Sequence, residues 1–196
     1  MTPVAGTIET LSTEEGVFKT PFINVDHSKV RFPNGVEGEY SVISNGEKKG
    51  AVIIPMTARR GIGYFGIVRQ YRYPVQDFTL EFPRGGAPDL EEGGAQIEIR
   101  EELGQEAKRL VRIGTIYPDT GILSTEVGVW LAILDSSVLD NDHLEGITGL
   151  RPEWIQEGSL EGMMMNGKIT CGMTLAAFMH FKLKRGQFGS LLNGAY

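Results

Sequence analysis

The sequence predicts an α/β protein, an α/β/α sandwich with a mixed sheet, preceded by a small N-terminal antiparallel β meander. Three observations lead to this prediction. Strand-like segments rich in β-branched and aromatic residues come first, a helix with an apolar stripe follows a glycine turn, and two further helix-like segments come near the end. At 196 residues and 41% hydrophobic content, the chain can bury one sizeable core.

The N-terminal part of the chain predicts the meander. Residues 1–16 are rich in Thr, Glu and Gly, and we expect them to be only loosely held. After them, apolar and polar residues alternate in three segments bounded by turn sequences: residues 17–25, 30–32 and 40–43. We therefore divide the chain into an N-terminal β-rich segment, residues 1–45, and a main domain, residues 46–196.

The main domain alternates predicted strands and helices. The expected strands are residues 51–56, 64–71, 78–82, 110–117 and 127–134. The last of these is almost wholly apolar, so it should lie in the middle of the sheet. The expected helices are one that starts at Pro88-Asp89 and stops at Gly104, and those of residues 152–165 and 170–184.

The helix before Gly104 has three closely spaced carboxylates. Glu98, Glu101 and Glu102 are related as i, i+3 and i+4, so they share roughly 100° of helix surface and form one acidic edge. The neighbouring stripe is apolar and places this edge at the margin of a buried face; its residues are Ala95, Ile99 and Leu103. Hard oxygen ligands without Cys or His nearby suit Mg²⁺ or Mn²⁺.

Two glycines, Gly85 and Gly86, stand between a predicted strand and this helix. They allow a tight turn and let backbone groups approach a metal-bound phosphate closely. The turn and the acidic edge together indicate a candidate site for a divalent metal and a diphosphate. The alternative interpretation of the edge is a charged, solvated helix face of the kind that many proteins have.

These residues resemble the signature box of the Nudix hydrolases, G-x5-E-x7-R-E-U-x-E-E-x-G-U, where U is aliphatic. The second half of the box is matched by Glu98, Ile99, Glu101, Glu102 and Gly104. The chain departs from the box at Ile97, where an arginine belongs, at Asp89, where a glutamate belongs, and at Gln105, where an aliphatic residue belongs. The loop before Asp89 is also about three residues short.

Segments on both sides of the box are similar to one branch of that family, the ADP-ribose pyrophosphatases. They are residues 17–43, the V-R-Q-Y-R segment within 67–74, the L-E-F-P segment of 80–83, the loop of 117–126, and residues 167–177. The resemblance implies the α/β/α sandwich fold. It also makes residues 1–45 the dimerisation segment of a homodimer.

The resemblance implies an enzyme that hydrolyses the diphosphate linkage of ADP-ribose or a related nucleoside diphosphate sugar. The products would be AMP, or another nucleoside monophosphate, and a sugar phosphate. Mg²⁺ or Mn²⁺ would be held by Glu98, Glu101, Glu102 and a backbone carbonyl near Gly85. The ion would neutralise the diphosphate and activate water.

A general base is implied either on the box helix, where Glu101 is the candidate, or in the loop of residues 140–145, where Glu145 is favoured. An ordinary exposed turn is the alternative interpretation of that loop. Glu126 matches a loop glutamate of the branch and is expected to orient the ligand.

The cations expected at the substrate come from the strand and the turn before the helix. Arg69 and Arg72 would point to opposite faces of one strand, so only one of them should meet a substrate phosphate. The resemblance favours Arg72 for this role over Arg69. Arg84 and Gly86, at the glycine turn, complete the substrate-binding set.

Two other functions remain open. The missing arginine at Ile97 and the short loop favour a catalytically weakened module that binds a nucleotide diphosphate without hydrolysing it. The same chemistry could also act on GDP-mannose, on another nucleotide sugar or on a dinucleotide. The presence of all three helix glutamates favours the enzyme, because a pure binder has less need for that repulsive edge.

Charge and composition limit the partners. A net charge of −6 and a pI near 5.2 disfavour nucleic acid and anionic membranes, and favour a small-molecule ligand. No uncharged run approaches the roughly 20 residues that a transmembrane helix needs, and the first residues lack the pattern of a signal peptide. Cys171 is the only cysteine, which fits a reducing compartment, so we expect a cytoplasmic protein.

Overall fold

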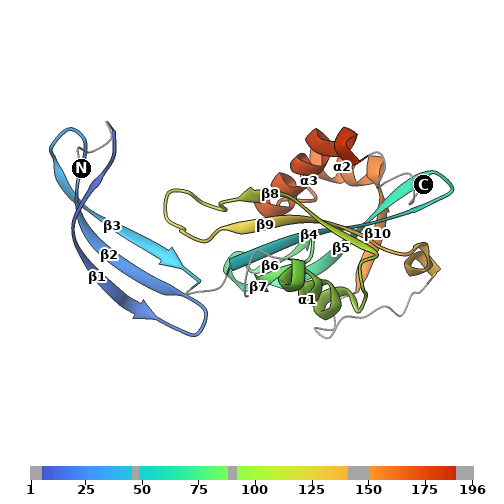
Figure 1. Cartoon of the computed structure of the whole chain (residues 1–196), viewed down its shortest axis with the longest axis horizontal. Helices are drawn as coiled ribbons and strands as arrows, with labels where there is room; N and C mark the ends of the chain where they lie inside the picture. The colour runs from blue at the N-terminus through green and yellow to red at the C-terminus, as the bar shows by residue number, and fades with distance from the viewer. Residues whose placement is uncertain (1–5, 46–48, 88–91, 141–150, 189–196) are drawn as a thin grey trace. The chain divides into compact units, whose positions relative to one another are not determined.

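The computed structural model describes residues 6–45, 49–87, 92–140 and 151–188. The chain divides into two compact units, one formed by Met1–Lys48 with Tyr117–Thr125 and the other by Lys49–Ile116 with Glu126–Tyr196. Each unit has a sheet of its own (Figure 1). Among the residues described, no helix is long and apolar enough to cross a membrane.

The first unit is an antiparallel sheet of three strands in chain order: β1 (Glu9–Lys19), β2 (Asn24–Arg31) and β3 (Glu37–Ser44). Residues 117–125 join its end, where the backbone N–H of Ile43 donates to the carbonyl of Ile122 at 2.9 Å. Within the described part of this unit, Val30 is the only hydrophobic side chain that is buried. The predicted meander is present, but it has almost no core of its own.

Two predictions about this meander were wrong. Residues 9–16 were expected to be loosely held, but they form most of β1 because their backbone pairs with β2. Residues 17–25 were expected as one strand, but the chain turns at Thr20, whose N–H donates to the carbonyl of Ile23 at 2.9 Å. The Thr20 hydroxyl also accepts a hydrogen bond from the N–H of Ile23 at 3.1 Å, so a single polar residue closes the turn.

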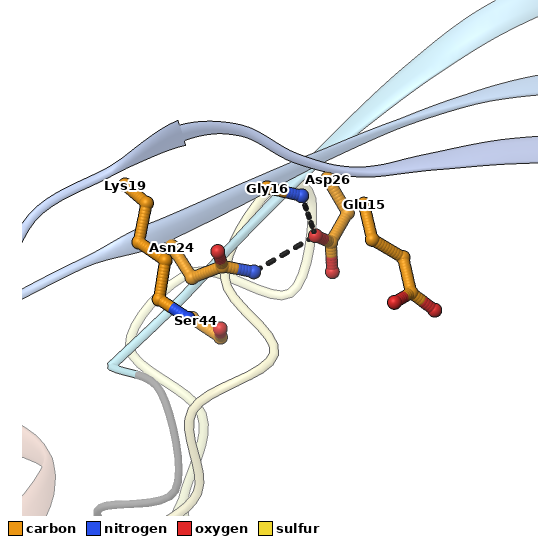
Figure 2. A pocket seen from close by; sticks show the side chains of 6 residues that line it. All are labelled: Glu15, Gly16, Lys19, Asn24, Asp26 and Ser44. Carbon is orange, nitrogen blue, oxygen red and sulfur yellow. Dashed lines mark hydrogen bonds between the residues drawn. The ribbon is translucent and has the colours of Figure 1, made fainter.

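Figure 2 shows an open polar hollow on this sheet, lined by Glu15, Gly16, Lys19, Asn24, Asp26 and Ser44. The Asp26 carboxylate accepts hydrogen bonds at 2.8 Å from the backbone N–H of Gly16 and from the side-chain amide of Asn24. Gly16 has a φ of +63° at a bulge in β1, a conformation that suits glycine. The polar groups of the hollow therefore hold the bulged strand in place.

The second unit has a seven-stranded sheet with helices on it. Its strands are β4 (Lys49–Arg59), β5 (Ile62–Arg72), β6 (Asp77–Glu81), β7 (Arg84–Ala87), β8 (Arg109–Ile116), β9 (Val127–Ile133) and β10 (Pro152–Gln156). Its helices are α1 (Glu92–Leu103), α2 (Glu157–Met165) and α3 (Gly172–Lys184), with 3-10 turns at Tyr73–Val75, Ser136–Asp140 and Arg185–Phe188. The strand order is β10-β5-β4-β9-β8, with β6 beside β5 and β7 beside β4.

This sheet is mixed and covered on both faces, which confirms the predicted fold class. β4 and β9 are parallel, whereas the other pairs are antiparallel. Val52, Ile54 and Met56 of β4 join the buried cluster that includes side chains of α2 and α3. Ala51 and Ile53 alternate with them and join the cluster that includes α1, which lies on the other side of the sheet (Figure 1).

The predicted central strand is confirmed, and one predicted helix is corrected. Every residue of β9 is buried, and the strand lies between β4 and β8. Residues 152–165 were expected to be a helix, but the first five of them form β10, and α2 begins only at Glu157. β10 pairs with β5, and the ring of Trp154 packs opposite Gly66, where a Cβ atom would lie 3.2 Å from it.

Docking of α1 on this sheet can be tested with two identical substitutions. Ile99→Ala should lower the free energy of unfolding by about 2–5 kcal/mol, because Ile99 is fully buried against the sheet. Ile97→Ala should change it by about 0.5 kcal/mol or less, because Ile97 is 46% exposed. Urea unfolding measures both values, and equal effects would contradict the orientation of α1.

Candidate functional site

The acidic edge predicted from the sequence lies on α1. The expected start of this helix at Pro88-Asp89 lies outside the described residues, and the described helix begins at Glu92. Its end is confirmed: Gly104 has a φ of +63°, and its N–H donates to the carbonyl of Arg100 at 3.1 Å. This left-handed glycine closes the helix directly after the acidic edge.

Burial separates the three carboxylates of the edge. The apolar stripe beside them is fully buried, as predicted: Ala95, Ile99 and Leu103. Glu98 and Glu102 are each only 7% exposed, at the margin of that buried face, whereas Glu101 is exposed on the same helix. Two of the three glutamates are therefore almost buried, and the third is exposed to solvent.

Glu98 lies against the backbone of β7 at Gly85. A Cβ atom at Gly85 would come within 2.1 Å of Oε2 of Glu98, and within 2.5 Å of all three carboxylate atoms. The turn predicted at Gly85 and Gly86 is wrong, because both glycines lie in strand β7 and pair with β4. Glycine is needed at position 85 for the close approach of backbone and carboxylate, not for an unusual backbone angle. Gly86 follows in the same strand, paired with Gly50 of β4.

Glu102 is held in an environment that disfavours its charge. Burial, and then the neighbouring carboxylate of Glu98, raise the pKa of Glu102 to about 7, although Arg72 and Arg84 oppose the shift. Its Oε2 atom is buried and has no hydrogen-bond partner among the residues that the structure describes. A buried, unpartnered carboxylate oxygen is costly, so this group is suited to accept a cation.

Next to these carboxylates, a third buried glutamate pairs with two arginines. Glu81 at the end of β6 is 1% exposed and accepts hydrogen bonds from Nε (3.0 Å) and Nη2 (2.6 Å) of Arg72 and from Nε of Arg84 (2.6 Å). The hydroxyl of Thr79 donates to it at 2.5 Å. Burial alone would raise the pKa of Glu81, but these three partners outweigh burial and lower it to about 2. Glu81 is therefore an anion at neutral pH.

The sequence interpretation missed Glu81 as a site residue. It stood only as part of the L-E-F-P segment, although a glutamate between apolar neighbours at a strand end is unusual. Its two partners come from different strands: Arg84, three residues after Glu81, is in β7, and Arg72, nine residues before it, is in β5. The pairing of the strands brings both guanidinium groups to one carboxylate, which the sequence pattern did not show.

The opposite faces predicted for the two strand arginines are confirmed. Arg72 reaches Glu81, whereas the guanidinium of Arg69 lies 3.9 Å from the ring centre of Phe78. Tyr71 also packs edge-on against Phe78, with ring centres 5.4 Å apart. Arg69 is thus on the face of β5 away from the buried glutamates.

The remaining predicted catalytic residues lie elsewhere or outside the described residues. Glu126 forms an ion pair with Arg112 at 3.1 Å. Glu145 lies outside the described residues. Asp140, at the start of its loop, pairs with Arg59 at 2.5 Å.

The donor set of this site fits Mg²⁺ or Mn²⁺ rather than a metal that needs a protein cage. Among the described residues, no three His, Cys, Asp or Glu side chains form a group that could hold a metal. Mg²⁺ is usually bound by one or two carboxylates, with water and substrate phosphates filling the other positions. The buried pair Glu98 and Glu102, with the unpartnered oxygen of Glu102, matches that requirement.

Comparisons with known proteins give a relative in sequence and a similar solved structure. No family model matches the chain. The chain is 30% identical over 121 residues to an ADP-ribose pyrophosphatase of Bacillus subtilis (strain 168), a match that covers 61% of this chain and 63% of that relative. The match thus spans less than two thirds of the relative's length.

The fold is also similar to a solved structure, that of an ADP compounds hydrolase. The TM-score is 0.73 at 18% identity, and the match covers 95% of this chain and 98% of the other. At this identity the likeness shows the fold, which agrees with the α/β/α class derived above.

The raised pKa of Glu102 predicts how stability depends on pH. Because the folded state binds this proton more tightly than the unfolded state, the free energy of unfolding should fall as the pH rises from about 4.5 to 7, by up to about 3 kcal/mol. Glu102→Gln removes this cost, so the variant should be more stable than the parent at pH 8 and similar to it at pH 4.

Urea unfolding in buffer free of divalent cations measures this difference. Glu101→Gln, on the exposed side of the same helix, is the control and should change stability little at either pH. A Glu102→Gln protein that is less stable than the parent at pH 8 would contradict the account.

Proposed function

We propose that this chain, which resembles the ADP-ribose pyrophosphatase branch of the Nudix hydrolases in its motifs and its fold, hydrolyses the diphosphate linkage of ADP-ribose or a related nucleoside diphosphate sugar. The products are a nucleoside monophosphate, AMP for ADP-ribose, and a sugar phosphate. One observation carries the proposal. Two buried helix carboxylates lie against the glycines of β7, with one oxygen that has no partner among the described residues, beside a buried anion that binds two arginines.

Glu98 and Glu102 would hold Mg²⁺ or Mn²⁺, with a backbone carbonyl near Gly85 as a further ligand. When bound, such an ion supplies charge neutralisation for the diphosphate and lowers the pKa of water. Glu101 is the remaining ligand of the predicted set, and it faces water on the same helix. Glu101 also stays a candidate base, together with Glu145.

Arg72 and Arg84 would bind the substrate phosphates. A guanidinium has five N–H donors in a planar fork, more than the bonds to Glu81 use, so each arginine keeps donors for a second anion. Glu81 holds both groups in place before substrate arrives, which lowers the entropy cost of binding. Gly86, which pairs with Gly50 of β4, completes the predicted substrate-binding set. Glu126, already paired with Arg112, would orient the ligand from the neighbouring loop, and Arg69, stacked on Phe78, is the weakest of the substrate-binding candidates.

The alternative is a module that binds a nucleotide diphosphate without turnover. Ile97 favours it, because an exposed isoleucine brings no charge to the edge where the box has an arginine. The raised pKa of Glu102 favours the enzyme. A buried carboxylate lowers the stability of the folded protein, and a binding module that uses no cation would gain nothing from it. The same site could also act on GDP-mannose or a dinucleotide.

Turnover measurements separate these possibilities. Purified protein is incubated with ADP-ribose and a panel of nucleotide sugars and dinucleotides, with and without Mg²⁺ or Mn²⁺, and released phosphomonoesters are quantified. We expect metal-dependent release of AMP from ADP-ribose, and a loss of about 100-fold or more in Glu102→Gln.

Glu106→Gln is the matched control, because Glu106 is exposed and pairs with Arg100 outside the site. It should keep the parent rate. Because Glu102→Gln is expected to be stabilised, its loss of activity cannot be attributed to unfolding. Binding of ADP-ribose without turnover of any substrate would favour the binding module.

The first unit would be the dimerisation segment of a homodimer. Its sheet has almost no core, yet it exposes several apolar side chains: Leu11, Val17, Phe18 and Phe22. A three-stranded sheet needs a packed face to be stable, and a second copy of the chain would supply one.

The single cysteine is a free thiol, in keeping with a cytoplasmic setting for this enzyme.

Sedimentation equilibrium of the full chain tests this assembly. The parent should have the mass of two chains at micromolar concentration. Phe18→Asp should shift the equilibrium towards the monomer, because it places a charge in the apolar interface. Tyr73→Asp changes an exposed aromatic side chain of the other unit and should leave the mass unchanged. A parent that is monomeric at all concentrations would refute the homodimer.

A further inference from the structure

Helix α1 brings no positive charge of its own to the buried glutamates. Ile97 stands where the signature box has an arginine and is 46% exposed. Arg100, the arginine that α1 does contain, is exposed and pairs with Glu106 beyond the end of the helix. Within the described part of α1, no other cationic side chain is present.

The positive charge near the acidic edge comes from the sheet instead. Arg84 stands at the start of β7, directly before Gly85, and its side chain binds Glu81 at 2.6 Å. The charge of Arg84 also lowers the pKa of Glu102, against the larger effects that raise it. Arg84 therefore acts on two of the buried glutamates at once, by an ion pair with Glu81 and by its charge on Glu102.

The charges of the described buried group come close to balance. Three carboxylates, those of Glu81, Glu98 and Glu102, lie with the two guanidinium groups of Arg72 and Arg84. Without Arg84, Glu81 would keep Arg72 and Thr79 as partners, but the excess of negative charge at the helix edge would grow by one unit. An acidic edge with that excess would bind cations more tightly but would repel a diphosphate more strongly.

We propose that Arg84 is a positioning residue that balances the charge of Glu98 and Glu102 from the sheet, in the place of the arginine that the helix lacks at Ile97. Glu81 holds the Arg84 guanidinium where it does this. The inference rests on the proposed function, since it concerns a cation site for a diphosphate. It gives Arg84 a role beyond phosphate binding, and it explains how the site can lack the helix arginine.

Titration calorimetry of the full chain with Mn²⁺ alone, without substrate, tests the charge balance. Arg84→Ala should bind Mn²⁺ roughly five- to tenfold more tightly than the parent, because one positive charge is lost beside the carboxylates. Ile97→Arg should weaken Mn²⁺ binding by a similar factor, and the double variant Arg84→Ala/Ile97→Arg should return towards the parent. Arg100→Ala removes the same charge outside the site and should change the affinity by less than about twofold.

Several outcomes would overturn the inference. They are an unchanged or weakened Mn²⁺ affinity in Arg84→Ala, a double variant that behaves like Arg84→Ala alone, and a parent that binds no Mn²⁺. A merely structural role for Arg84 would lower the Mn²⁺ affinity together with the melting temperature. Differential scanning calorimetry of the same samples measures the melting temperature. If Arg84→Ala does not fold, Ile97→Arg in the parent background still tests the charge balance, because position 97 is on the surface.

Turnover of ADP-ribose provides the second readout. Arg84→Ala should lower kcat/KM by about tenfold or more, and adding Ile97→Arg should restore part of the loss. A parent that turns over no substrate, with the Mn²⁺ affinities as expected, would refute the proposed hydrolase and leave the charge balance supported. A parent that is active, with Mn²⁺ affinities that do not respond to Arg84→Ala, would refute the charge balance alone.

Discussion

The burial of two helix carboxylates beside a strand backbone is the constraint on which the rest of the structure depends. Glu98 and Glu102 are almost out of water, and such charges are tolerated only where something compensates them. The compensation comes from three sides: a glycine whose missing side chain makes room for Glu98, two arginines that meet at Glu81, and a carboxylate oxygen left open to a cation. Together, these three features compensate the burial of the two carboxylates.

The layered fold holds this compensation in place. Alternate residues of β4 face α1 and α3, so the sheet fixes the height of α1 above β7. Arg72 ends β5, and Glu81 ends the neighbouring strand β6, so hairpin pairing brings the guanidinium to the carboxylate. Arg84 begins β7 three residues after Glu81 ends β6, and its side chain binds the same carboxylate. The site is thus built from strand ends and one helix face, which a rigid core supports better than mobile loops would.

Much of the fold and part of the site could be predicted from local pattern. The spacing of Ala95, Ile99 and Leu103 predicted the docked face of α1, the glycine at 104 predicted its end, and the apolar run of β9 predicted a buried strand. The pattern failed where a partner strand decided the outcome. Residues 9–16 and 152–156 became strands because β2 and β5 offered unpaired backbone groups, which no local propensity reports.

Residue types and periods along the chain were enough to identify an acidic helix edge and the layered α/β class, because these depend on contacts within a few residues. They also placed Arg69 and Arg72 on opposite faces, since side chains of a strand alternate. The turn predicted at Gly85 and Gly86 is instead strand β7, because β4 pairs with it. The tertiary structure alone decided which charges are buried and which meet. In the folded chain Glu101 is exposed and Glu102 is buried, and Glu81 pairs with two arginines from different strands. Burial and ion pairing depend on distances across the sheet rather than along the chain.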